Sequence, residues 1–207
     1  MSLSNVNELQ DMHLDVLKEI GNIGSGNAAG ALADFLQVPT DITVPSVKLL
    51  DFSETVNFLG GPENVAIGML VNIKGDINGM MLYVLEKDFA SKMTSSLFGS
   101  EIEDLYNMND MERSLIQEVG NIMAASYMNA LASLTGMMID ISVPTLTVDM
   151  VGAILSVPAI EFAQIGDKVL FIDDRFIIDS GEVKSNMILV PELQSLETLF
   201  EKLGVSI

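Results

Sequence analysis

The chain has 207 residues, of which 49% are hydrophobic and 19% charged, and 29 acidic against 10 basic side chains give it a net charge of −19. This composition excludes an intrinsically disordered chain, because enough apolar surface is present to form a core. It also argues against binding to nucleic acid or to an anionic membrane, since both depend on Lys and Arg. A protein partner with a basic docking face fits this charge, and so does a role in solubility alone.

The mean hydropathy of +0.40 raises the question of membrane insertion. The apolar run at 150–160 is too short to cross a bilayer, which takes about 20 residues. The run at 24–33 is interrupted by three glycines, a serine and an asparagine. We therefore expect a cytoplasmic protein that does not insert into a membrane.

The chain contains no cysteine and a single histidine, His13. Disulfides, thiolate catalysis and Cys-based metal sites are therefore excluded. A Ser-His-Asp triad, a two-histidine zinc motif and a histidine phosphocarrier pathway all lack parts. His13 itself lies near the start of a predicted helix, where we expect a surface or capping role.

In chain order, the apolar spacing first predicts a helix over 8–37. Strands follow at 42–50, 65–73 and 77–85, the last two joined by a Lys74-Gly75-Asp76 turn. A short helix over 87–98, ended by Gly99, closes this first half.

The second half repeats this order after a candidate linker near 100–110. A helix is predicted over 108–136, and strands at 141–148, 169–178 and 183–190. Pro191 and Glu192 begin a final helix that extends to about residue 203.

An internal repeat explains the parallel between the halves. Residues 15–51 align without a gap on residues 114–150, at an offset of 99, with eleven identities in thirty-seven positions. The identical positions, in first-half numbers, are Glu19, Gly21, Asn22, Ile23, Ala31, Leu32, Ala33, Asp41, Ile42, Val44 and Pro45.

A period near 100 residues indicates duplication of a small unit rather than a solenoid. We expect an α+β fold with pseudo-twofold symmetry, in which long helices pack on an antiparallel sheet. Each half alone has too few elements to bury a core. The prediction is one domain, 1–207, made of two repeats at about 8–100 and 107–207.

Three polar residues share one face of each long helix. At 100° per residue, positions i, i+4 and i+7 fall at about 0°, 40° and −20° around a helix. Asp15, Glu19 and Asn22 occupy these positions, and the second copy is Ser114, Glu118 and Asn121. A solvated helix face is the ordinary alternative, but the repetition of Glu and Asn in register favours a function.

The chemistry open to Glu and Asn is limited. An Asn side chain is neither a nucleophile nor a base at neutral pH, but its donors and acceptor can hold a water in a chosen orientation. That suffices for phosphoryl transfer, where the protein contributes mainly positioning and charge stabilisation. The Glu side chain would suit a Lys of a partner. A substrate protein must supply the remaining groups.

Four glycines lie inside the first predicted helix, at positions 21, 24, 26 and 30, where each costs up to about 1 kcal/mol relative to Ala. Close approach of another helix would explain them. A nucleotide-binding loop is disfavoured, because its glycines would follow a strand and open a helix. The second copy has Met123, Ala125 and Asn129 in place of Gly24, Gly26 and Gly30.

These residues resemble the CheC/CheX/FliY family of chemotaxis phosphatases, whose signature is Asp/Ser-x3-Glu-x2-Asn-x22-Pro. Asp15, Glu19, Asn22 and Pro45 match the signature with its full spacing, and the stretch EIGNIGSGNAAGAL is also typical of the family. The second match consists of Ser114, Glu118, Asn121 and Pro144.

The resemblance implies hydrolysis of the aspartyl phosphate on the receiver domain of CheY. Asn22 and Asn121 would orient the attacking water, and Glu19 and Glu118 would bind the receiver's active-site Lys. Mg²⁺ would belong to the receiver, so no cofactor of the chain's own is expected. The family also implies binding to CheD, a receptor-modifying deamidase.

The motif residues Asp15, Ser114, Pro45 and Pro144 are given only a supporting role, the prolines at the first strand of each half. The differences between the copies leave open whether both sites are active.

Other functions also remain open. The chain could be a non-catalytic adaptor that sequesters phosphorylated CheY or CheD, or a component of the flagellar switch. The pairs Met80-Met81 and Met137-Met138 fit either a core or an adaptable interface. Asp173-Asp174 could suggest a metal site, although a solvated turn is the simpler expectation.

Overall fold

The computed structural model describes residues 3–165, 168–179 and 181–205. The first half contains η1 (Val6–Glu8), α1 (Asp11–Leu36), β1 (Thr40–Asp51), α2 (Phe52–Phe58), β2 (Val65–Gly75), β3 (Gly79–Leu85) and α3 (Lys87–Phe98). The second half contains η2 (Leu105–Asn107), α4 (Asp110–Thr135), β4 (Ile139–Ile141), β5 (Thr145–Met150), α5 (Val151–Ile165), β6 (Lys168–Ile178), β7 (Gly181–Pro191) and α6 (Leu193–Lys202).

The strands form one antiparallel sheet in the order β1-β6-β7-β3-β2-β4, with β5 also paired to β2. The first strand of each half therefore pairs with the hairpin of the other half: β1 with β6, and β4 and β5 with β2. Neither half holds a complete sheet by itself. The prediction that residues 1–207 form one domain remains a prediction.

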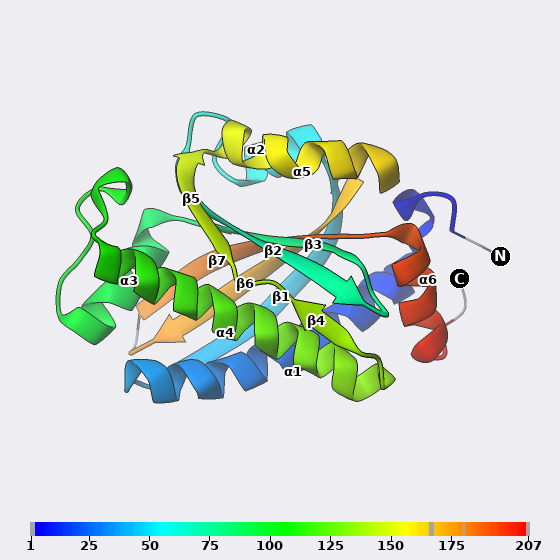
Figure 1. The fold of residues 1–207 in the computed structure, drawn as a ribbon, viewed down its shortest axis with the longest axis horizontal. Coiled ribbons are helices and arrows are strands. Elements are labelled where there is room, and N and C mark those ends of the chain that lie inside the picture. Colours follow the sequence, from blue (N-terminus) through cyan, green and yellow to red (C-terminus); the bar gives the residue numbers. More distant parts are fainter. Residues whose placement is uncertain (1–2, 166–167, 180, 206–207) are drawn as a thin grey trace.

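Two helical layers cover the sheet (Figure 1). The long helices α1 and α4 lie antiparallel on one face, and α2 and α5 lie over the other. Side chains alternate between the two cores as the pleat requires. On β3, for example, Met81, Tyr83 and Leu85 face α1 and α4, whereas Leu82 and Val84 face the opposite core.

The repeat extends to the backbone. Both long helices have 26 residues and begin 99 residues apart, and each is preceded by a short 3₁₀ helix at the same offset. The strands β2 and β6 show the same order of buried and exposed positions over their first ten residues. The predicted α+β fold, with long helices on an antiparallel sheet, is confirmed.

Close contact between α1 and α4 depends on one glycine. A Cβ on Gly24 would lie 2.9 Å from the Cα of Tyr127, so any side chain at this position would force the helices apart. Gly21 also packs against α4 and β1, but a Cβ on Gly26 or Gly30 would meet no atom within 4 Å. The predicted close approach is confirmed at Gly24 and wrong at Gly26 and Gly30.

Several predicted elements differ from the structure. The helices α2 and α5 were not expected. The first is short and depends on a capping box between Asp51 and Glu54, and the second contains Pro158, which normally ends a helix. Residues 100–110 are not an exposed linker, because Ile102 and Leu105 are buried in the core. The strand predicted at 141–148 is divided into β4 and β5.

Candidate functional site

The motif residues lie along one stripe of each long helix, as the spacing predicts. On α1, Asp15 and Glu19 are exposed and Asn22 is half-buried. On α4, Ser114 and Glu118 are exposed and Asn121 is half-buried, so the two copies match position by position. Within the described chain, neither glutamate forms an ion pair or a hydrogen bond, so both carboxylates are available to a partner.

A one-residue β-bulge lies beside each motif and contains the motif proline. Thr43 pairs with Arg175 and Ser46 with Asp173, so three steps on β1 match two on β6. In the second half, the pairings of Ile141 with Ile73 and of Thr145 with Leu70 give four steps against three. Proline has no N–H for the ladder, which explains why Pro45 and Pro144 fall at these interruptions.

Asn22 is tied to the bulge of the first half. The backbone N–H of Val44 donates a hydrogen bond of 3.0 Å to Oδ1 of Asn22. A bulge leaves one residue outside the strand ladder, and a buried N–H needs an acceptor. The Asn22 carboxamide therefore contacts β1, and its oxygen already accepts a hydrogen bond from the backbone.

In the second half, the backbone groups at the bulge have different hydrogen-bond partners. The N–H of Ser142 donates to the carbonyl of Asn72, and the N–H of Asn72 donates to Oγ of Ser142. Nε2 of Gln117 donates to the carbonyl of Pro144 at 2.7 Å. Among the described residues, the Asn121 side chain makes no hydrogen bond, so its whole carboxamide is available.

The antiparallel packing separates the two motifs along the helix pair. With Gly24 opposite Tyr127, the rise of 1.5 Å per residue places Asn22 and Asn121 about 12 Å apart along the axes. Glu19 and Glu118 lie farther out, about 21 Å apart on the same measure. The motifs therefore do not combine into one site, and each can meet a partner separately.

The single histidine takes no part in either motif. His13 is 2% exposed, its Nδ1 accepts a hydrogen bond from the backbone N–H of Gln10, and its ring packs edge-on against Phe200 at 4.8 Å. The predicted capping role is confirmed, and the surface alternative is wrong. In the described ranges, no group of three or more His, Cys, Asp or Glu side chains is placed to hold a metal ion.

A buried acid lies beneath the helix crossing. Asp174, on β6, is 6% exposed and lines a small void together with Ser25, Tyr83 and Tyr127. Burial raises the pKa of its carboxyl well above the ordinary value, and the charge of Asp173 adds to the shift. Burial and the neighbouring Asp174 also raise the pKa of both tyrosines. The solvated turn expected at Asp173-Asp174 is wrong, because both residues belong to a strand.

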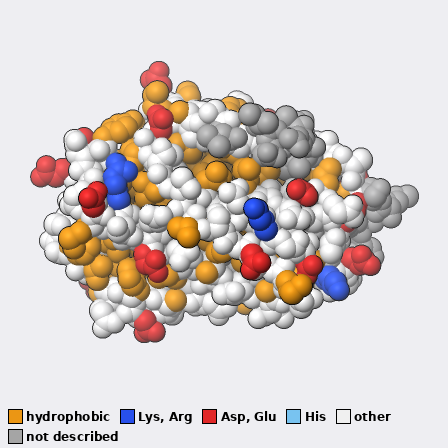
Figure 2. Space-filling view, in the orientation of Figure 1, with side chains coloured by type: hydrophobic (Ala, Val, Ile, Leu, Met, Phe, Trp, Pro, Cys, Tyr) orange, Lys and Arg blue, Asp and Glu red, His pale blue; other side chains and the backbone are white. Residues whose placement is uncertain are grey.

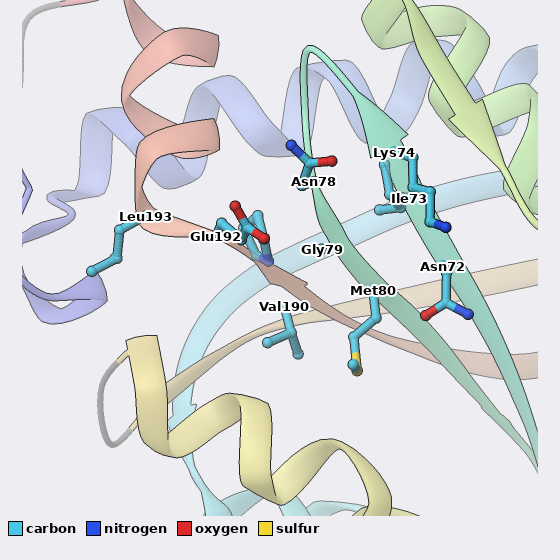
Figure 3. Close-up of a pocket in the computed structure, with 10 residues that line it drawn as sticks. Asn72, Ile73, Lys74, Asn78, Gly79, Met80, Val190, Glu192 and Leu193 are labelled. Atoms are coloured by element: carbon cyan, nitrogen blue, oxygen red, sulfur yellow. The ribbon is translucent and has the colours of Figure 1, made fainter.

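A pocket of about 440 Å³ lies away from the motifs, where the β2–β3 hairpin meets the start of α6 (Figure 3). Its polar side chains are Asn72, Lys74, Asn78 and Glu192, above Met80 and Val190. Val190 belongs to the core on the α2 and α5 side, and Met80 packs against it, so this pocket is on the opposite face of the sheet from the motif helices. No motif residue lines it.

Solved structures of other proteins share this fold. The structure of Thermotoga maritima FliY matches with a TM-score of 0.76 and 22% identity, over 95% of this chain and 98% of that one. The middle domain of Helicobacter pylori FliM matches with a TM-score of 0.67 and 15% identity, over 94% and 99%. At these identities the likeness concerns the fold alone.

Sequence comparison identifies the family. The chain is 36% identical over 210 residues to the CheY-P phosphatase CheC of Bacillus subtilis (strain 168), which covers 99% of this chain and 100% of that protein. The profile of the CheC-like family matches residues 12–49 and 111–148, which are the two segments that carry the motifs. The chain belongs to the CheC-like family. No helix within the described residues is long and apolar enough to span a membrane.

Proposed function

We propose that this chain is a chemotaxis phosphatase that accelerates hydrolysis of the aspartyl phosphate on a CheY receiver domain. The observation that carries the proposal is the duplicated pair of an exposed Glu and a half-buried Asn, each on a segment that matches the family profile. The name of the B. subtilis relative, CheY-P phosphatase CheC, supports the same activity.

The proposed mechanism uses the Asn side chain to position water. When the helix docks on the receiver, the carboxamide of Asn22 or Asn121 enters the receiver's active site and hydrogen-bonds the attacking water. The water attacks phosphorus, the bond to the aspartyl oxygen breaks, and inorganic phosphate leaves. Glu19 or Glu118 accepts a hydrogen bond from a Lys of the receiver, which fixes the docking orientation.

The receiver supplies the remaining groups: the phosphorylated aspartate, the lysine and Mg²⁺, which neutralises charge on the phosphoryl oxygens. This division of labour fits the motif surroundings. The helix face offers no cysteine, and His13 is buried against Phe200. The groups that remain on this face position and bind rather than attack.

The test is dephosphorylation of a receiver domain by the Asn22→Ala/Asn121→Ala double variant. We expect loss of all stimulated phosphate release, because each site loses its water-positioning amide. Asn27→Ala/Asn129→Ala is the matched control, since both residues are exposed on the same two helices outside the motifs. Stimulation that survives the motif double variant, with thermal unfolding unchanged, contradicts the assignment of the asparagines.

Binding to CheD is a second part of the proposal, supported by family membership alone. Co-purification of the chain with CheD, with and without phosphorylated CheY, tests it. The adaptor alternative predicts a different result: a stable complex with phosphorylated CheY and no release of phosphate. A flagellar-switch role would instead require co-purification with motor proteins.

A further inference from the structure

An apolar groove of about 380 Å³ lies at the end of the molecule where α3 meets the start of α4. Figure 2 shows hydrophobic side chains gathered at this end. The groove is formed by side chains from the C-terminal ends of α1 and α3 and the first two turns of α4: Phe35, Leu97, Phe98, Met111, Ser114 and Leu115.

The groove continues the face that carries the second motif. Ser114 belongs to both. Taking Ser114 as 0°, Glu118 and Asn121 lie at about 40° and −20°, and Met111 lies at about 60° on the same stripe. A partner that covers Glu118 and Asn121 therefore meets Met111 about two turns beyond Glu118 on the same stripe.

The distance from Asn121 to the groove is smaller than the radius of a standard protein interface. Ser114 and Asn121 are seven residues apart, which is about 10 Å along the helix axis. A standard protein interface buries about 800 Å² on each partner, equivalent to a disc of roughly 16 Å radius. An interface centred on Asn121 therefore covers Ser114 and reaches Met111, about 15 Å along the axis, at its edge.

Three large hydrophobic side chains of the groove are exposed to solvent. Met111 is 66% exposed, and Leu97 and Phe98 are 38% and 39% exposed. Adjacent exposed large hydrophobic side chains mark interaction surfaces, and Met adapts its shape to a partner.

Charge selects the occupant. Asp110 lies at the rim of the groove, exposed Glu118 follows on the same stripe, and the whole chain carries −19. A second copy placed here would bring like charges together, and it would cover the second motif. A receiver domain that offers its active-site Lys to Glu118 brings the opposite charge.

We propose that this groove binds an apolar side chain of the receiver domain that is docked on the second motif, and so strengthens docking at that site. The inference rests on the proposed phosphatase function. The contact holds the receiver on α4 while Asn121 acts, and it takes no part in the chemistry.

In the first half, the side chains at the position equivalent to the groove are different. Asp11 and Met12 correspond to Asp110 and Met111, but α6 ends in Lys202-Leu203-Gly204 where α3 ends in Leu97-Phe98-Gly99. The N-caps, Glu86 and Glu192, and the buried residues of the two helices match at an offset of 106, so Leu203 corresponds to Leu97 and Gly204 to Phe98. The aromatic ring therefore has no counterpart in the first half. The groove should serve the second site alone.

The experiment measures dephosphorylation of a receiver domain phosphorylated with acetyl phosphate, over a range of receiver concentrations. Met111→Glu is introduced into Asn22→Ala, in which only the second site acts. We expect the half-saturating receiver concentration to rise about tenfold with an unchanged maximal rate, because the variant loses an apolar contact and places a charge in the groove. Phe98→Ala should act in the same direction.

Matched controls separate the groove from general effects. Met12→Glu makes the same change at the equivalent, 51% exposed position of α1, and it should leave the second site unaffected. Met111→Glu in Asn121→Ala should leave the first site unaffected. Glu is a good residue for the first turn of a helix, so the variants should fold, as thermal unfolding will verify.

Three results would overturn the inference. One is an unchanged half-saturating concentration in both groove variants. Another is a change of oligomeric state by Met111→Glu in sedimentation, which would make the groove a contact between copies. The third is loss of CheD binding with unchanged receiver kinetics. If the double Asn variant remains active, the proposed function itself fails, whatever the groove does.

Discussion

The two motif regions lie on helices of equal length, beside bulges of equal size, yet their asparagines have different partners. Asn22 accepts the N–H of Val44, whereas within the described chain Asn121 makes no hydrogen bond. The bulge of the second half is satisfied instead through Asn72 and Ser142. After duplication, the backbone kept its geometry and the side-chain partners diverged.

The same divergence occurs inside the core. The matching burial patterns of β2 and β6 place Val71 and Asp174 at equivalent positions, both facing α1 and α4. At the helix crossing, Gly24 corresponds to Met123 and Tyr127 to Ala28. Because equivalent positions carry different residues, substitutions at them test which contacts stabilise each half.

The largest effect is expected at the helix crossing. Gly24→Ala places a methyl group 2.9 Å from the Tyr127 backbone, so the unfolding free energy should fall by about 1–3 kcal/mol. Gly26→Ala has no atom within 4 Å of its new methyl group and should gain up to about 1 kcal/mol from helix propensity. Urea unfolding of both variants measures the difference. Equal unfolding free energies would show that the helices can separate without cost.

The next effect concerns the buried acid. The folded-state pKa of Asp174 is raised above its ordinary 3.8, so the folded protein holds this proton more tightly than the unfolded chain. Its contribution to stability is therefore full below pH 3.8 and is lost as the pH rises toward the folded-state pKa.

Asp174→Asn and Asp174→Val should remove this dependence, and at neutral pH each should raise the unfolding free energy by about 1–3 kcal/mol, the usual desolvation penalty. The Val variant copies the residue at the equivalent position of the first half, Val71. Unfolding measured from pH 4 to pH 8 should show the gain over the parent chain growing with pH. A gain that is constant over this range contradicts the assignment to the Asp174 carboxyl.

The smallest effect distinguishes the two catalytic candidates. The hydrogen bond from the Val44 N–H must break before the Asn22 carboxamide can position a water, which costs roughly 1 kcal/mol. The activity of the first site should therefore be about fivefold lower than that of the second. Asn121→Ala should then reduce phosphate release about sixfold, and Asn22→Ala by less than a fifth, on the same estimate. Initial rates with one receiver preparation decide the order. A greater loss with Asn22→Ala would show that the hydrogen bond preorganises the first site instead.

Periodic signals in the sequence predicted much of the fold. Both long helices, the hairpin strands and α3 follow from the spacing of apolar residues and from Gly99 at a helix end. The short α2 and the proline-containing α5 could not be predicted in this way, because one has too few turns to show a period and the other breaks the usual rule for proline.

The motif residues were predicted as a set, because spacing fixes which side chains share a helix face whatever the rest of the chain does. Their environments were not predictable. That Asn22 is bonded to a strand and that Asp174 is buried under two tyrosines depend on which strand lies beneath which helix.

The sequence by itself determined the duplication, the stripe of Glu and Asn on each long helix and the lack of a nucleophile or base beside them. These features follow from residue identity and from the helical repeat, which are local. Only the tertiary structure decided that the halves exchange their first strands, that the two asparagines are held differently and that an apolar groove adjoins one motif. Such contacts join residues far apart in the chain, and no local spacing encodes them.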